Sequence, residues 1–132
     1  MTTASGFVRD YLERVVNERD LSAVDELVSA DYRGGGFGWP EDVTALQDFY
    51  RWQAASRPDW AIEVQETVEV DGCVVVRAFA GGTITDDEHG RPLAAPAQRA
   101  VEWLAMYRLA AGQITEIRVL ELRERTSPVQ DT

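Results

Sequence analysis

Two glutamates interrupt the apolar phase of two predicted strands. Glu66 shares the alternating phase of Val64 and Val68, and Glu121 shares the phase of Val119. Both carboxylates are therefore expected to point into an apolar interior, where burial without a cation raises the pKa of a carboxyl group toward neutrality and suits it to general acid or base catalysis. A β-bulge, or a place at the open end of a strand, would instead return each glutamate to water. Both interpretations stay open at this point.

The single histidine, His89, lies in the run Asp-Glu-His-Gly at residues 87–90. A polar, glycine-containing run of this kind is typical of a surface flap, and a solvated loop histidine is the simpler interpretation. If the flap closes over a pocket, His89 is the natural proton carrier near neutral pH.

The remaining residue types exclude several kinds of site. All 13 basic residues are Arg, so the chain has no Lys for a P-loop or a Schiff base. Cys73 is the only cysteine, and with one histidine it can form neither the usual zinc site nor an intrachain disulfide. We therefore predict no metal site. One free thiol and an N-terminus unlike a signal peptide favour a cytoplasmic location.

Length and charge limit the partners. A chain of 132 residues suits one domain, and no segment reaches the roughly 20 apolar residues of a membrane helix. The formal net charge of -10 repels phosphate backbones and anionic lipids, so we expect no nucleic-acid or membrane partner. Neutral or apolar small molecules are the expected ligands.

The periodicity of apolar residues changes once along the chain. Helical spacing predicts three helices, over residues 3–17, 22–30 and 40–56, and a glycine-rich extended piece lies at 32–38. Alternation then predicts strands at 60–70, 73–85, 98–109 and 114–123, with a long flap at 86–97. We expect one domain over residues 1–125, a frayed tail at 126–132, and an α+β fold in which the helices cover a curved sheet.

The aromatic residues and the outer face of this sheet suggest a pocket and a partner. Four Trp in a small chain can line an aromatic cavity rather than fill a solid core. Both phases of residues 102–107 are apolar, so the outer face is expected to pack against a second copy, giving a homodimer. The predicted substrate-binding residues are Tyr32, Trp39, Phe49, Trp52, Phe79, Trp103, Tyr107 and Val119.

The order of these pieces resembles the SnoaL-like polyketide cyclases of the nuclear transport factor two-like superfamily. The resemblance is carried by residues 11–21, 27–32, 57–60, 72–77 and 106–114. It implies a cone-shaped fold with three N-terminal helices on a curved antiparallel or mixed sheet, an apolar pocket, a frequent dimer through the outer sheet face, and no metal or organic cofactor. Such cyclases close rings with an aspartate on the last strand. That position holds Val119 here, and Glu121 is the nearest substitute carboxylate.

Two functions follow as alternatives. The first is a cofactor-independent cyclase or isomerase of a polyketide-like or other apolar natural-product intermediate, with Glu121, Glu66 or His89 moving a proton. The second is a pocket protein that binds a hydrophobic small molecule without turning it over.

Overall fold

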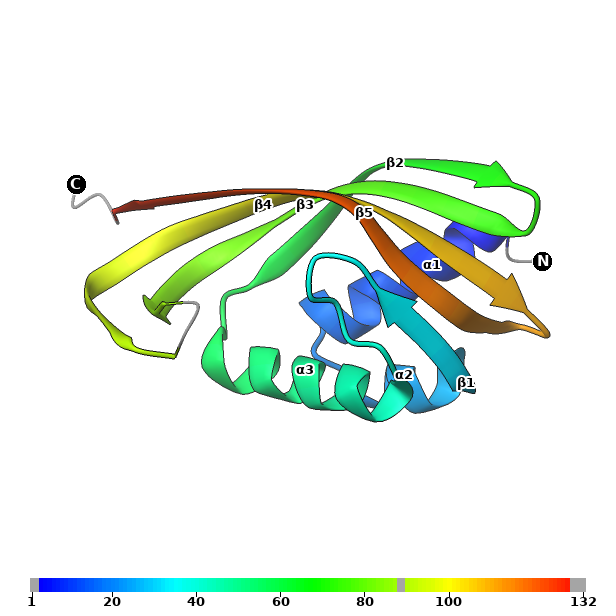
Figure 1. Ribbon diagram of the computed structural model, residues 1–132, viewed down its shortest axis with the longest axis horizontal. Coiled ribbons are helices and arrows are strands. Elements are labelled where there is room, and N and C mark those ends of the chain that lie inside the picture. Colours follow the sequence, from blue (N-terminus) through cyan, green and yellow to red (C-terminus); the bar gives the residue numbers. More distant parts are fainter. Residues whose placement is uncertain (1–2, 88–89, 129–132) are drawn as a thin grey trace.

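The computed structural model describes residues 3–87 and 90–128, in which short helices precede a long-stranded sheet (Figure 1). A π-helical turn, Glu13–Asn17, continues the first helix. The elements in chain order are α1 Ala4–Leu12, α2 Ser22–Leu27, β1 Val28–Gly35, α3 Val43–Ser56, β2 Ala61–Val70, β3 Cys73–Asp86, β4 Pro92–Ala110 and β5 Gln113–Pro128.

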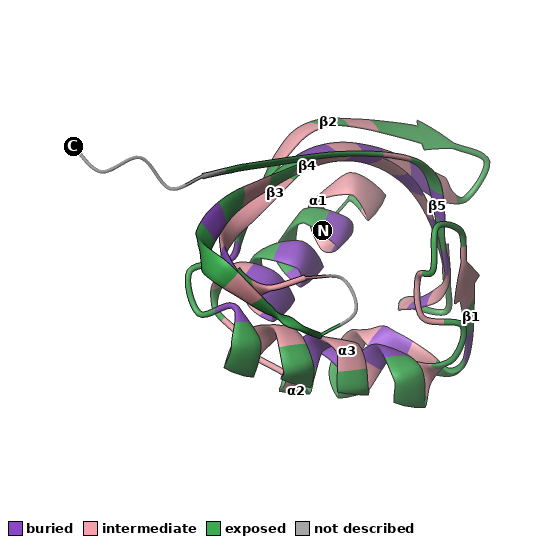
Figure 2. Cartoon of the chain, turned by 60° about the vertical axis from the view of Figure 1, so that its left-hand side comes forward, coloured by how far each residue is buried: buried purple, intermediate pink, exposed green. Residues whose placement is uncertain are grey.

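The strands form one open, mixed sheet in the order β1-β5-β4-β3-β2. β1 pairs parallel with β5, and every other neighbouring pair is antiparallel. The sheet curves over the helices, which lie beneath its concave face (Figure 2). This arrangement confirms the predicted α+β fold, with three helices on a curved mixed sheet.

The helix boundaries follow from local capping. Asp42 accepts a hydrogen bond from the amide of Ala45 at 2.8 Å and so fixes the start of α3 at Val43, later than the expected start at residue 40. α2 ends at Leu27, before the expected residue 30, because Val28 already belongs to β1. Among the described residues, no helix is long and apolar enough to cross a membrane.

The core lies between α1 and the concave face of the sheet. Tyr11 and Leu12 of α1 are fully buried, as are Val76 of β3 and Ala105 of β4. The apolar side of α1 and the inward-facing residues of the strands thus bury each other. This burial of apolar surface is the main contribution that stabilises an amphipathic helix on a sheet.

The strands are longer than the sequence predicts at two places. β4 begins at Pro92, so much of the expected flap at 86–97 is strand that pairs with β3. β5 continues to Pro128, beyond the expected end of the ordered domain at residue 125, because Gln98 and Arg99 of β4 pair with Ser127 and Thr126. His89 lies outside the described residues, so its predicted role remains a prediction.

The glycine-rich run at the end of β1 allows neighbouring groups to approach its backbone closely. A Cβ at Gly34 would meet the Tyr32 hydroxyl, and a Cβ at Gly36 would meet the carbonyl oxygen of Val119. Gly36 also has a φ of 93°, which side-chain-bearing residues rarely adopt. The run therefore packs tightly against β5 and directs the following residues, Phe37 and Trp39, toward the space above α3.

Candidate active site

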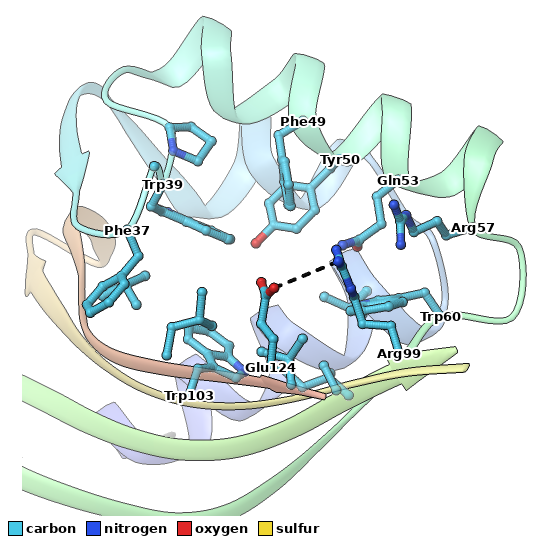
Figure 3. A pocket seen from close by; sticks show the side chains of 18 of the residues that line it. Phe37, Trp39, Phe49, Tyr50, Gln53, Arg57, Trp60, Arg99, Trp103 and Glu124 are labelled. Carbon is cyan, nitrogen blue, oxygen red and sulfur yellow. Dashed lines mark ion pairs between the residues drawn. The ribbon is translucent and has the colours of Figure 1, made fainter. Parts of the chain in front are cut away.

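A pocket of about 260 Å³ lies between α3, the loop after β1 and the inner face of β4 and β5 (Figure 3). Exposed Phe37 stands at its mouth. Its wall is mainly apolar and includes the aromatic residues Trp39, Phe49, Tyr50, Trp52, Trp60 and Trp103. Such a wall suits the flat face of an unsaturated or polycyclic ligand.

Trp39 is the centre of this aromatic wall. Its ring stacks on Trp103 with centroids 6.0 Å apart and lies 5.0 Å from Phe49. Its indole N–H donates to the Tyr32 hydroxyl at 3.1 Å, and that hydroxyl in turn donates to the carbonyl of Pro40 at 3.1 Å. Tyr32 is not among the lining residues; it lies behind the wall and positions Trp39, and its predicted contact with a ligand remains a prediction.

Two buried tyrosines provide a test of this role. Tyr32→Phe removes two hydrogen bonds and leaves the indole N–H unpaired, so we expect a loss of about 1–3 kcal/mol in the free energy of unfolding. Tyr107→Phe removes a buried hydroxyl that has no hydrogen-bond partner among the described residues, and should leave that free energy unchanged or raise it by about 1 kcal/mol. Urea denaturation measures both, and equal losses would contradict the assignment.

The pocket has a polar side, which lies where β4 and β5 pair beyond Trp103 and Leu122. Val101 pairs with Glu124, so Glu124 shares the inner face with Trp103 and Leu122. The Glu124 carboxylate points into the pocket and forms an ion pair with Arg99 at 3.8 Å (Figure 3). With 42% of its side chain exposed, Glu124 keeps contact with water while facing the aromatic wall.

Tyr50 of α3 brings a hydroxyl to the same space. Its side chain is buried, and its hydroxyl points into the pocket (Figure 3). Burial raises the pKa of Tyr50 above its ordinary value, although a hydrogen bond from the Tyr11 hydroxyl at 3.4 Å opposes the shift. Tyr50 therefore stays protonated at physiological pH and can donate to a ligand oxygen.

Arg57 closes one end of the pocket. It follows α3, where its amide donates to the carbonyl of Gln53 at 2.9 Å. Its guanidinium carbon lies 4.9 Å from the Trp52 ring centroid and 5.6 Å from that of Trp60, and its Nη2 is 3.7 Å from Asp86. Desolvation lowers the pKa of Arg57, but the group remains a cation at physiological pH.

The two predicted glutamates lie on the outer face of the sheet, so their expected inward orientation is wrong. The β2–β3 register shifts between Val64 and Glu66, which turns Glu66 toward Arg77 at 3.6 Å. The β4–β5 register likewise shifts just before Glu121, which pairs with Arg123 at 2.7 Å. Bulges of this kind are the alternative that the sequence left open. Whether either carboxylate moves a proton remains a prediction.

The predicted binding residues divide into three groups. Trp39, Phe49, Trp52, Trp103 and Val119 line the pocket. Tyr32 and Tyr107 are buried in the core behind it, and Phe79 lies on the outer face beside Arg77 and is 42% exposed.

Several site residues escaped sequence reasoning. Glu124 was missed because the bulge in β5 changes the strand's phase after Val119, and a strict alternation places Glu124 outside. Arg99 has no motif around it, and residues 57–60 carried the family resemblance without a functional role for Arg57. Tyr50 and Trp60 carried a weak signal, since both are aromatic residues in predicted helix or strand positions. Among residues 3–87 and 90–128, no group of three or more His, Cys, Asp or Glu side chains is placed to hold a metal ion.

Comparison of the sequence with known protein families gives one match. The sequence model of the SnoaL-like domain matches residues 8–117, which include most of the pocket. The chain belongs to the SnoaL-like domain family. No curated protein sequence matches this SnoaL-like domain.

Solved structures share the fold of this SnoaL-like domain. IdmH from Streptomyces antibioticus, described as a putative polyketide cyclase, is 24% identical over 92% of this chain and 90% of its own, with a TM-score of 0.67. A SnoaL-like polyketide cyclase from Agrobacterium tumefaciens is 17% identical over 93% of each chain, with a TM-score of 0.73. TsrD from Streptomyces laurentii is 16% identical over 96% and 91%, with a TM-score of 0.71. Identities this low establish the common fold alone.

Proposed function

We propose that this SnoaL-like domain is a cofactor-independent cyclase or isomerase of a polyketide-like or other apolar natural-product intermediate. The observation that carries the proposal is the pairing of a carboxylate, Glu124, with a protonated phenol, Tyr50, both directed into an aromatic pocket. The polyketide cyclases among the similar structures are consistent with it.

The chemistry is a proton transfer at carbon. Glu124 takes a proton from a carbon next to a ketone, and the electron pair of that C–H bond moves onto the ketone oxygen, forming an enolate. Tyr50 donates a hydrogen bond to this oxygen and stabilises its developing charge. Return of the proton from Glu124 to another carbon of the enolate isomerises the substrate.

Ring closure uses the same two groups. The enolate carbon attacks a second carbonyl carbon of the substrate, a C–C bond forms, and the new alkoxide takes the proton held by Glu124. The aromatic wall holds the chain folded so that the two carbons meet, which lowers the entropic part of the barrier.

The alternative function is binding without turnover. It is favoured by Val119, which lines the pocket with an apolar side chain at the position where the family resemblance leads us to expect an aspartate. The experiment must therefore separate binding from proton transfer.

The test uses 2-tetralone, a bicyclic aromatic ketone with exchangeable C–H bonds. We expect the protein to accelerate exchange of its α-hydrogens in D2O, followed by NMR, beyond the rate given by the same concentration of acetate. Quenching of tryptophan fluorescence by 2-tetralone measures binding. Binding without accelerated exchange would support the pocket protein and contradict the enzyme, and neither effect would contradict both.

We also propose a homodimer formed through the outer sheet face, and a cytoplasmic location suited to the one free thiol, Cys73. Large apolar side chains on the sheet, Val68, Val70, Phe79 and Leu120, are between 42% and 52% exposed. Covering them by a second copy would bury apolar area at one self-complementary interface. Light scattering at micromolar concentration should give twice the mass of the chain, and a monomer mass would contradict the dimer.

A further inference from the structure

Arg57 has hydrogen-bonding capacity that the protein does not use. It is 5% exposed and is the only charged side chain among the described residues that is buried. Its Nε has no hydrogen-bond partner within the described part of the chain. The 3.7 Å contact with Asp86 is longer than a hydrogen bond, so it contributes charge attraction without satisfying an N–H group.

Burying a guanidinium with an unpaired N–H group is unfavourable in free energy. A guanidinium carries five N–H donors in a planar fork and has no acceptor, so each buried donor needs an acceptor from another group. Leaving a buried donor unpaired is unfavourable, more so for a charged group. The neighbouring rings of Trp52 and Trp60 attract the cation but offer no oxygen. An oxygen acceptor from a ligand is the missing partner.

The charges along the pocket favour an acidic oxygen. The charged groups among the described lining residues are the cations Arg57 and Arg99 and one anion, Glu124. Arg99 lies 3.8 Å from Glu124 and offsets its charge, whereas Asp86, the carboxylate 3.7 Å from Arg57, is not part of the lining; Arg57 is therefore the cation whose counter-charge lies outside the pocket wall. This local excess occurs in a chain whose formal net charge is -10.

We propose that Arg57 binds an anionic oxygen of the ligand, a carboxylate or an ionised phenol or enol, while the aromatic body of that ligand packs along Trp39, Phe49 and Trp103. The inference builds on the proposed function, because it names the substrate class: an amphipathic aromatic acid in place of a wholly apolar molecule. The planar fork of Arg57 can hold both oxygens of a carboxylate at once.

The test compares two probes with the same ring, 2-naphthoate and 2-naphthalenemethanol, by isothermal titration calorimetry at pH 7. We expect naphthoate to bind the wild-type protein at least roughly tenfold more tightly, the size of one hydrogen bond to a charged group. Equal affinities in the wild-type protein would overturn the proposal without the need of any variant.

Two arginine variants locate the preference. Arg57→Met should bring the two affinities together. Arg51→Met is the matched control, because Arg51 lies on the adjoining helix α3, is 68% exposed and pairs with Asp48, so the preference should persist. Persistence of the preference in Arg57→Met, or its loss in Arg51→Met, would overturn the assignment to Arg57.

Two further comparisons distinguish a lost anion site from a misfolded variant and from a failure of the proposed enzyme activity. Circular dichroism shows whether Arg57→Met is folded, and Arg57→Lys, which keeps the charge but not the fork, should lose most of the preference if the carboxylate is held by two hydrogen bonds. Naphthoate preference without 2-tetralone exchange would support the Arg57 site and contradict only the enzyme. Exchange without naphthoate preference would do the reverse.

Discussion

Replacing Glu124 by glutamine is expected to slow the exchange of 2-tetralone by about 10²–10⁴-fold. The amide keeps the size of the side chain and its place on β5, but it cannot accept the proton that leaves carbon. Binding of 2-tetralone should change little, because the aromatic wall remains. NMR exchange rates and fluorescence titrations on the same samples measure the two effects separately.

Glu102→Gln is the matched control for this change. Glu102 lies on β4, is 40% exposed and faces Arg77 at 3.9 Å, which closely resembles the 42% exposure and 3.8 Å ion pair of Glu124. The two glutamates differ in the face of the sheet they occupy, since Glu102 pairs with outward-facing Phe79. Equal rates for Glu102→Gln and Glu124→Gln would contradict the assignment of Glu124 as the base.

The same assay decides between Glu124 and the carboxylates predicted from the sequence. From their outward orientation we expect Glu121→Gln and Glu66→Gln to exchange 2-tetralone at the rate of the unmodified protein. A loss confined to Glu121→Gln would reinstate the sequence-based prediction.

Gly36→Ala is expected to lower the free energy of unfolding by more than about 3 kcal/mol. A side chain at positive φ costs about 1–2 kcal/mol, and the added Cβ would also meet the backbone carbonyl of Val119, which cannot move without disturbing β5. Because the same loop carries Phe37 and Trp39, binding of 2-tetralone should weaken as well.

Gly38→Ala separates the two causes. Gly38 has a φ of 78° in the same loop, but no atom lies within 4 Å of the position that an alanine Cβ would occupy there. We expect it to lose only the conformational part, about 1–2 kcal/mol. Urea denaturation of both variants measures the difference, and similar losses would show that contact with Val119 is unimportant.

The fold was predictable where local chemistry alone decides the structure. Asp71 and Gly72 adopt φ values of 46° and 78°, the positive pair that a two-residue hairpin requires, as their sequence predicts. The glycine-rich run at residues 32–38 was predicted only as an extended piece, and its close contacts with Tyr32, Pro40 and Val119 at Gly34 and Gly36 appear in the structure alone.

The site was harder to predict because it depends on where strands slip. A bulge is a property of two paired strands, so the sequence of β5 alone cannot show that its phase changes before Glu121. The sequence did not indicate a ligand-binding role for Arg57 either, because its burial depends on Trp52 of α3 and on Trp60, which precedes β2. The aromatic wall was partly predictable, since large rings in small domains gather in cores and cavities, but separating Tyr32 and Tyr107 from Trp39 needs the packing itself.

The register shift in β5 affects the charge of the pocket. If the same sequence of β5 paired with β4 without the bulge, strict alternation would direct Glu121, Arg123 and Arg125 inward and send Glu124 to the far side. The charged side chains facing the pocket would then be mostly basic, although the amino-acid composition had not changed. The bulge thus decides which of the charged residues of β5 a ligand meets.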